Sequence, residues 1–193
     1  TFSAPIDFNG SETFAVSVED AEYTDSQIIT VTVNAVNDAP ALEVVADQNM
    51  NEGGTKVLLL SGSDVDEDVL IYSITDGTNI ISSIDGSTVT FSVIDDDWNG
   101  SESFTATVSD GEYTEDQIFT VTVNNVNDAP VLAAVSDLSY DEDGTTTLDL
   151  SASDVDEDVL TFSISGGTNI TATLVDSQVT FTSATNFNGS ETF

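Results

Sequence analysis

The chain has 193 residues, of which 36 are Asp or Glu and only one, Lys56, is basic, so its formal net charge is -35. It contains no His, Cys or Arg, which excludes a thiolate nucleophile, an imidazole base and a zinc site built from His and Cys. One basic residue cannot balance phosphates, so we expect neither nucleic acid nor an anionic membrane surface as a partner. No apolar run approaches the ~20 residues of a membrane span, and membrane insertion is therefore not expected.

Self-similarity divides the chain into three pieces. Asn37-Asp38-Ala39-Pro40 recurs at 127–130 and the segment 63–70 recurs at 153–160, in both cases 90 residues later. That period is too long for a solenoid unit and suits one small domain. We expect the C-terminal part of one repeat over 1–36, a complete repeat over 37–126 and the N-terminal part of a third over 127–193, the whole being a window on a longer protein.

The complete repeat is predicted to contain about seven strands. In chain order they cover residues 42–45, 57–60, 70–74, 80–84, 89–93, 104–108 and 119–123. In most of them apolar residues alternate with Thr and Ser, as in half-buried strands, and glycine-containing turns separate them. This pattern predicts an all-β, Ig-like Greek-key sandwich. The inward side chains are expected to be Leu58, Leu60, Tyr72, Ile74, Phe91, Phe104, Val108, Val121 and Val123.

The acidic residues collect at strand ends and turns in four motifs that follow the period. These are the linker Asn37-Asp38-Ala39-Pro40, the turn 51–54 with Glu52, the pair Asp64-x-Asp66, and Asp110 after a strand. Their counterparts are 127–130, the turn 141–144 with Glu142, Asp154-x-Asp156, and Asp20. Alternate carboxylates at a turn can converge on one cation, and oxygen ligands suit Ca²⁺.

The order of these motifs resembles that of cadherin repeats and of the cadherin-like repeats of large bacterial surface adhesins. Residues 126–130 are similar to the cadherin linker with one Asn fewer. Ile94-Asp95-Asp96-Asp97 stands where cadherins have Leu-Asp-Arg-Glu, with Asp96 in place of the Arg. The resemblance spans the whole chain and implies calcium ions bound between successive repeats.

Carried over position by position, the resemblance implies two sets of calcium ligands. The first set is Asp7, Asp20, Asn37, Asp38, Glu52, Asp64 and Asp66. The second set is Asp97, Asp110, Asn127, Asp128, Glu142, Asp154 and Asp156. In the third repeat Asn186 replaces the Asp found at positions 7 and 97. The missing linker Asn and the missing Arg leave the number of ions in each junction open.

Several features also have simpler interpretations. The alternative for Asp64-x-Asp66 is a solvated acidic turn, and Glu67 and Asp68 are expected to be surface charges. The Asn-Gly pairs at 9, 99 and 188 predict turns with positive φ, although the same triplets read as glycosylation sequons in a host that glycosylates. Trp98 aligns with Phe8 and Phe187, which indicates a packing aromatic rather than a sugar platform.

The expected function is that of an extracellular, secreted or cell-surface rod, stiffened by calcium, that supports adhesion or a biofilm matrix. Catalysis is not expected, because the acids recur at every junction instead of forming one cleft. One alternative is a building block of a filament or sheath, with other copies of the chain as partners. Another is a module that binds cell-surface glycans, for which Tyr23 and Tyr113 are the candidate aromatics.

Overall fold

The computed structural model describes all 193 residues, as strands and connecting loops without a helix. It therefore offers no helix that could cross a membrane. The chain forms two compact units, Thr1–Asn125 and Val126–Phe193. The first unit holds an N-terminal hairpin and the complete repeat, and the second holds the third repeat.

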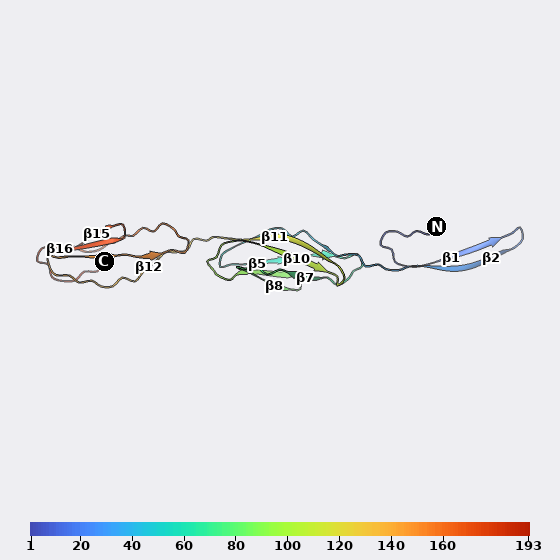
Figure 1. Ribbon diagram of the computed structural model, residues 1–193, viewed down its shortest axis with the longest axis horizontal. Helices are drawn as coiled ribbons and strands as arrows, with labels where there is room; N and C mark the ends of the chain where they lie inside the picture. Colours follow the sequence, from blue (N-terminus) through green and yellow to red (C-terminus); the bar gives the residue numbers. More distant parts are fainter. The chain divides into compact units, whose positions relative to one another are not determined.

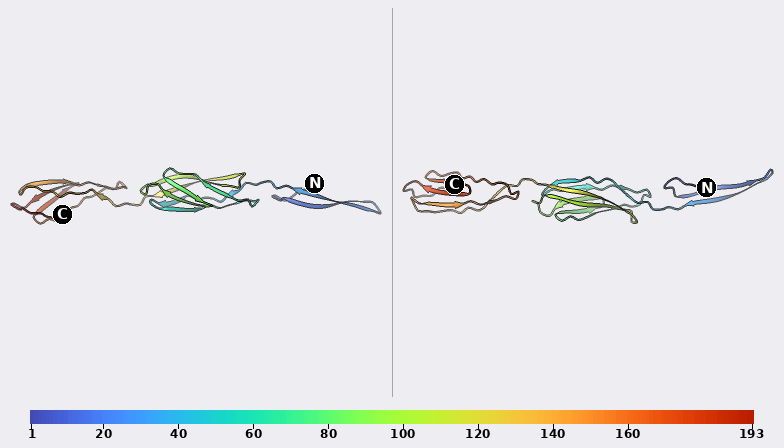
Figure 2. Two further views of the ribbon diagram at one scale, coloured as in Figure 1. Left: turned by 90° about the horizontal axis from the view of Figure 1, so that it is seen from below. Right: turned by 45° about the horizontal axis from the view of Figure 1, so that its top comes forward.

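Two sheets of the complete repeat face each other across one core, and their layers can be followed in Figures 1 and 2. The strands are β3 (Ala41–Leu42), β4 (Gln48–Asn51), β5 (Thr55–Leu59), β6 (Gly62–Ser63), β7 (Ile71–Ile74), β8 (Ile80–Asp85), β9 (Thr88–Val93), β10 (Gly100–Ser109) and β11 (Thr114–Asn124). One sheet has the order β4-β11-β10-β7 and the other the order β5-β9-β8, while β3 pairs with β6. Only β4 and β11 run parallel. The all-β sandwich predicted from the alternation is confirmed.

The core of the complete repeat lies between the two sheets and is built around three phenylalanines. Phe91 meets Phe104 edge-on at a centroid distance of 5.0 Å and Phe119 at 6.1 Å. All nine residues predicted to point inward belong to this core or pack against it. Trp98 also packs against it, as expected of a structural aromatic, and its ring lies where a side chain at Gly100 would have to go.

The first strand of the complete repeat differs from its prediction. Of the predicted strand 42–45 only Leu42 lies in a strand, as the second residue of β3, and Val44 is 90% exposed. Instead β4 forms at residues 48–51, where the sequence has no alternation and a single apolar residue, Met50. This strand exists because β11 offers it a free edge, along which Met50 pairs with Val123.

The N-terminal hairpin repeats the central pair of strands of the sandwich. It consists of β1 (Gly10–Glu19) and β2 (Thr24–Val33), and its register, Gly10 opposite Val33, matches Gly100 opposite Val123 in β10 and β11. In the complete repeat this face is buried, whereas here Val16 is 54% exposed. The hairpin (blue in Figures 1 and 2) has no second sheet opposite it.

The third repeat forms only part of the same sandwich. Its strands are β12 (Val131–Leu132), β13 (Thr145–Asp149), β14 (Ala152–Ser153), β15 (Ile170–Val175) and β16 (Gln178–Ser183). The counterparts of β4 and β7, residues 138–141 and 161–164, are not strands. In the complete repeat β4 pairs with β11 and β7 with β10, and the third repeat has no strands equivalent to those partners. A groove of about 1190 Å³, lined by both apolar and polar side chains of the third repeat, lies beside these segments.

Candidate metal centre

Three loops bring polar side chains together where the complete repeat begins. They are the linker before β3, the loop between β6 and β7, and the turn between β10 and β11. The Asn37 side-chain amide donates to Asp110 Oδ2 at 2.9 Å, although 73 residues separate them. The Asp38 backbone N–H donates to Asp66 Oδ2 at 2.8 Å. The linker is thereby attached to both loops, and we call this group (Asn37, Asp38, Asp64, Asp66 and Asp110) the leading cluster.

Asp64 organises the loop of the leading cluster through one of its carboxylate oxygens. Its Oδ1 accepts hydrogen bonds from the backbone N–H of Asp66 at 2.8 Å and of Asp68 at 3.3 Å. Its other oxygen, Oδ2, is buried and has no hydrogen-bond partner. A buried anionic oxygen without a partner is costly, which favours a bound cation as the missing partner. The carboxylates of the leading cluster offer oxygen atoms, the kind of ligand that Ca²⁺ prefers.

Asp110 belongs to the leading cluster and also accepts hydrogen bonds within its own turn. Its Oδ1 accepts hydrogen bonds from the N–H of Tyr113 at 2.6 Å and of Glu112 at 2.7 Å, closing the β10–β11 turn. The hydrogen bond from Tyr113 contributes most to lowering the pKa of Asp110, which keeps the carboxylate charged. Asp20 closes the β1–β2 turn in the same way, and hydrogen bonds from Glu22 and Tyr23 lower its pKa.

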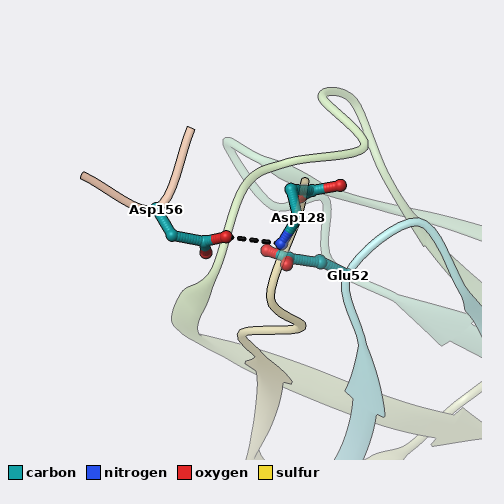
Figure 3. A group of neighbouring side chains, drawn as sticks. All are labelled: Glu52, Asp128 and Asp156. Carbon is teal, nitrogen blue, oxygen red and sulfur yellow. Dashed lines mark hydrogen bonds between the residues drawn. The ribbon is translucent and has the colours of Figure 1, made fainter. Parts of the chain in front are cut away.

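The third repeat reproduces the linker and the acidic loop. The Asp128 N–H donates to Asp156 Oδ2 at 2.6 Å, a bond drawn in Figure 3, and the Asp156 N–H donates to Asp154 Oδ1 at 3.0 Å. The residue after each second Asp has the same backbone, with φ of 61° at Glu67 and 59° at Glu157. Asn127, which has no counterpart of Asp110 available, donates instead to the Asp128 carbonyl. Two independent copies therefore fold the Asp-x-Asp motif alike.

Glu52 lies where the complete repeat ends. Its backbone N–H donates to the carbonyl of Asn124, the last residue of β11, at 3.0 Å. The adjacent Gly53 packs against Asp96, so the acidic loop of Asp95, Asp96 and Asp97 is close to it. We call these four residues, Glu52, Asp95, Asp96 and Asp97, the trailing cluster. The trailing cluster and the leading cluster lie at opposite ends of β11. The 11 residues of this strand span about 35 Å.

The structure groups several of the predicted ligands differently from the two expected sets. Asp110 was expected in the second set, yet it contacts Asn37 of the first. Glu52 was expected in the first set, yet it lies beside Asn124, just before the second linker. Asp20 is at the tip of a hairpin whose other end leads to the linker, and Glu142 is followed by β13, which separates it from Asp154. The grouping differs because each strand takes the chain to the opposite end of the sandwich, so consecutive motifs alternate between ends.

One functional carboxylate of the fold was not predicted. Glu102 in β10 accepts hydrogen bonds from the N–H groups of Thr78, Asn79 and Ile80 and from the Asn79 side chain, at 2.8 to 3.2 Å. It thus connects one sheet to the start of β8 in the other. In the third repeat, Glu191 accepts hydrogen bonds from the backbone N–H groups of residues 168–170 and from the Asn169 side chain. Gly-Thr-Asn-Ile recurs after 90 residues and Asn-Gly-Ser-Glu after 90 and then 89, and this shared recurrence is the signal that could have linked them.

Fold and repetition together define a protein made of tandem Ig-like β-sandwiches. A family model described as bacterial Ig domain matches residues 37–124 and 127–193, and the chain belongs to this family. Bacterial Ig domains are typical of extracellular or surface proteins, and Ig-like domains are typically non-catalytic. No curated protein sequence shows significant similarity to the chain.

Three solved structures illustrate the range of similar folds. An endo-fucoidan hydrolase from glycoside hydrolase family 107 is 19% identical, with 94% of this chain and 30% of that chain covered and a TM-score of 0.38. Human protocadherin-24 EC1-2 is 20% identical over 62% of each chain, with a TM-score of 0.45. The titin domains z1z2 in complex with telethonin are 12% identical, covering 79% and 84%, with a TM-score of 0.38. The chain spans less than a third of the fucoidan hydrolase.

Proposed function

We propose that the chain is a calcium-stiffened structural or adhesive region of a large extracellular surface or matrix protein, without catalytic activity. The observation that carries the proposal is Asp64 Oδ2, a buried carboxylate oxygen that lacks a partner inside a cluster of oxygen donors. The formal net charge of -35 supports the same proposal, because repulsion among so many carboxylates opposes folding unless cations neutralise them.

The residues that would hold calcium follow from the two clusters and the linkers. The leading cluster supplies Asn37, Asp38, Asp64, Asp66 and Asp110, and the third repeat supplies Asn127, Asp128, Asp154 and Asp156. The trailing cluster adds Glu52 and Asp97. Glu52 is hydrogen-bonded to Asn124, and Asp128 follows Asn124 by four residues. At most about 14 Å of extended chain therefore separates Asp128 from Asn124. Asp7 occupies the place of Asp97 in the N-terminal repeat. Asp20 and Glu142 would serve junctions to other repeats.

Calcium bound by two neighbouring repeats and their linker would remove a hinge. Short linkers leave domains free to bend because few contacts cross the boundary. An ion that holds oxygen ligands from both sides at about 2.3 to 2.6 Å would fix the junction. Such stiffening suits a region that holds an adhesive segment away from a cell or builds a biofilm matrix.

The direct test is calcium binding by the chain and by an Asp64→Asn variant, measured by isothermal titration calorimetry in chelator-treated buffer. The wild type is expected to bind calcium at roughly 10⁻⁴ to 10⁻³ M, the range of extracellular modules, and magnesium more weakly. Asp64→Asn keeps the shape but loses a charged ligand, and should lose the binding step of the leading cluster.

The matched control is Asp76→Asn, which removes the same charge from an exposed position outside both clusters. Its calorimetric profile should equal that of the wild type. Asp154→Asn should affect the other linker alone, because each junction contacts only its neighbours. Equal binding by wild type and Asp64→Asn would leave the acids as surface charge and refute the proposal.

A further inference from the structure

The linker that precedes the complete repeat is attached at both of its ends to that repeat. At its start, the Asn37 side chain donates to Asp110 and the Asp38 N–H donates to Asp66. At its end, Pro40 is buried. Proline has a fixed φ and restricts the residue before it to extended backbone, so little freedom remains between the two ends.

The attachment continues into the segment between β3 and β4. The Leu42 N–H donates to Glu115 Oε2 at 2.5 Å. Gln117 accepts a hydrogen bond from the Val45 N–H and donates one to the Leu42 carbonyl, both at 2.8 Å. Glu115 and Gln117 belong to β11, so side chains of this strand hold the backbone that follows the linker. The linker is therefore continuous with a segment that is itself fixed to the sandwich.

The second linker is attached in the same direction. Its Asp128 N–H donates to Asp156 Oδ2, within the third repeat. The boundary between the two compact units lies between Asn125 and Val126, before this linker. Both linkers are thus joined to the repeat on their C-terminal side by the same hydrogen bond from backbone to carboxylate.

The residues just before the first linker have no such attachment. β2 ends at Val33, and the following residues 34–36 are all exposed, Val36 to 78%. None of these three residues forms a hydrogen bond with another segment. A segment with few contacts is the part of a chain that moves at the least cost in free energy. Bending at 34–36 breaks nothing, whereas bending within the linker breaks the hydrogen bonds of Asn37 and Asp38.

We propose that each linker is bound to the repeat that follows it without any ion, and that the chain bends before the linker and not within it. The leading cluster is then an assembled half of a calcium site, because hydrogen bonds alone hold its residues together. Calcium has only to capture the preceding repeat, and ligands that are already ordered lose less conformational entropy on binding. This role of calcium rests on the proposed function, whereas the attachment of the linker does not.

The test is the backbone order of the full chain in chelator-treated buffer, measured by NMR relaxation of the amide nitrogens, which reports picosecond-to-nanosecond motion. The amides of Asp38 and Ala39 should have order parameters of about 0.85, like those of β10 and β11. The amides of 34–36 should have clearly lower values. A linker with order parameters below about 0.6 in chelator overturns the inference, and so does equal order in the two segments.

Two variants test whether the assigned hydrogen bonds hold the linker. Asn37→Ala combined with Asp66→Ala removes both of them and should lower the order parameters of the linker amides toward those of the segment before it. Unchanged values in β10 show that the repeat is still folded. Asp68→Ala is the control for the lost charge, because Asp68 lies in the same acidic loop and is bonded through its backbone to Asp64 and not to the linker. A double variant whose linker stays ordered, or a control whose linker becomes mobile, contradicts the inference.

A calcium titration separates this inference from the proposed function. Bound calcium should leave the order parameters of Asp38 and Ala39 unchanged, because these residues are already rigid. A linker that becomes rigid only when calcium is added overturns the inference while supporting the proposed function. A linker that is rigid in chelator, together with no calcium binding by calorimetry, refutes only the proposed function.

Discussion

Glu102 shows how one charged residue can hold two sheets together. Desolvation raises the pKa of its carboxyl, but hydrogen bonds from Asn79, Ile80 and Thr78 outweigh this and lower the pKa overall. The neighbouring Gly77 leaves no room for a side chain, because a Cβ would overlap the Ile80 carbonyl and the Glu102 carboxylate. The recurring Gly-Thr-Asn-Ile and Asn-Gly-Ser-Glu motifs are therefore two halves of one structural contact.

Glu102→Gln is expected to destabilise the complete repeat by about 1–2 kcal/mol. An amide offers one acceptor oxygen, and its NH₂ group would face backbone donors. The carboxylate is partly exposed, which keeps the figure below that of a fully buried charge. Urea denaturation measures the change, with Glu43→Gln as the exposed control. A midpoint equal to that of the wild type would show that the contact is replaceable by water.

The same residue predicts a pH dependence. Because the pKa of Glu102 is lower in the folded state than its ordinary 4.5, its contribution is present above pH 4.5 and is lost as the pH falls through the folded-state pKa. Hydrogen bonds from Thr168, Ile170 and Asn169 lower the pKa of Glu191 to about 2. The contribution of Glu191 to the stability of the third repeat should therefore also be lost on acidification. The gap in melting temperature between wild type and Glu102→Gln should narrow on acidification below pH 4.5. A constant gap from pH 7 to pH 2 would contradict this account.

At the scale of elements, β10 and β11 form the centre of the sandwich, and the hairpin β1–β2 is the same pair of strands without a sandwich around it. Every other strand of the larger sheet depends on this pair, since β4 pairs only with β11 and β7 only with β10. Hairpins without a second layer are only marginally stable in water. The β10–β11 and β1–β2 hairpins are therefore expected to differ in stability because they differ in burial, and not because their strand sequences differ.

Phe104→Ala and Phe14→Ala are the matched substitutions that test this difference. Phe104 is fully buried, and its removal should cost about 3–5 kcal/mol, whereas Phe14 in the isolated hairpin should cost well under 1 kcal/mol. Hydrogen exchange should likewise be slow for the amides of β10 and β11 and fast for those of β1 and β2. Equal protection of the two hairpins would contradict the assignment of stability to burial.

At the scale of the whole molecule, the proposed calcium sites would determine how freely successive repeats bend. Small-angle scattering in chelator should report a broad distribution of dimensions. Adding millimolar calcium should narrow the distribution and increase the maximum dimension, because carboxylates that repel each other become shared ligands. At free calcium about 100 times the dissociation constant, each site adds about 2.7 kcal/mol to the folded state, so the melting temperature should rise as well.

Magnesium supplies the control for that experiment. It requires a small octahedral site and releases its waters reluctantly, so an equal concentration should change scattering and melting far less than calcium does. An equal response to both ions would indicate general screening of the negative charge.

The sequence alone was sufficient for the fold class, for the repetition and for the inward residues of the complete repeat. Alternation of apolar residues with Thr and Ser specifies which side of a strand is buried, and it did so correctly for Phe91, Phe104 and Val121. The shape of the Asp-x-Asp loop was also foreseeable, since both copies form the same hydrogen bonds between neighbouring residues. Local patterns fix these features because the interactions behind them are local.

Features that depend on distant partners were decided only by the tertiary structure. Residues 71–74 and 161–164 have similar alternating sequences, yet only the first form a strand, because only there does β10 provide a partner. Likewise, no pattern near Asp110 or Glu52 reveals that the first meets Asn37 and the second meets Asn124. A strand's hydrogen bonds and a cluster's ligands come from segments about 70 residues away, so their positions depend on how the sheets assemble and not on the residues beside them.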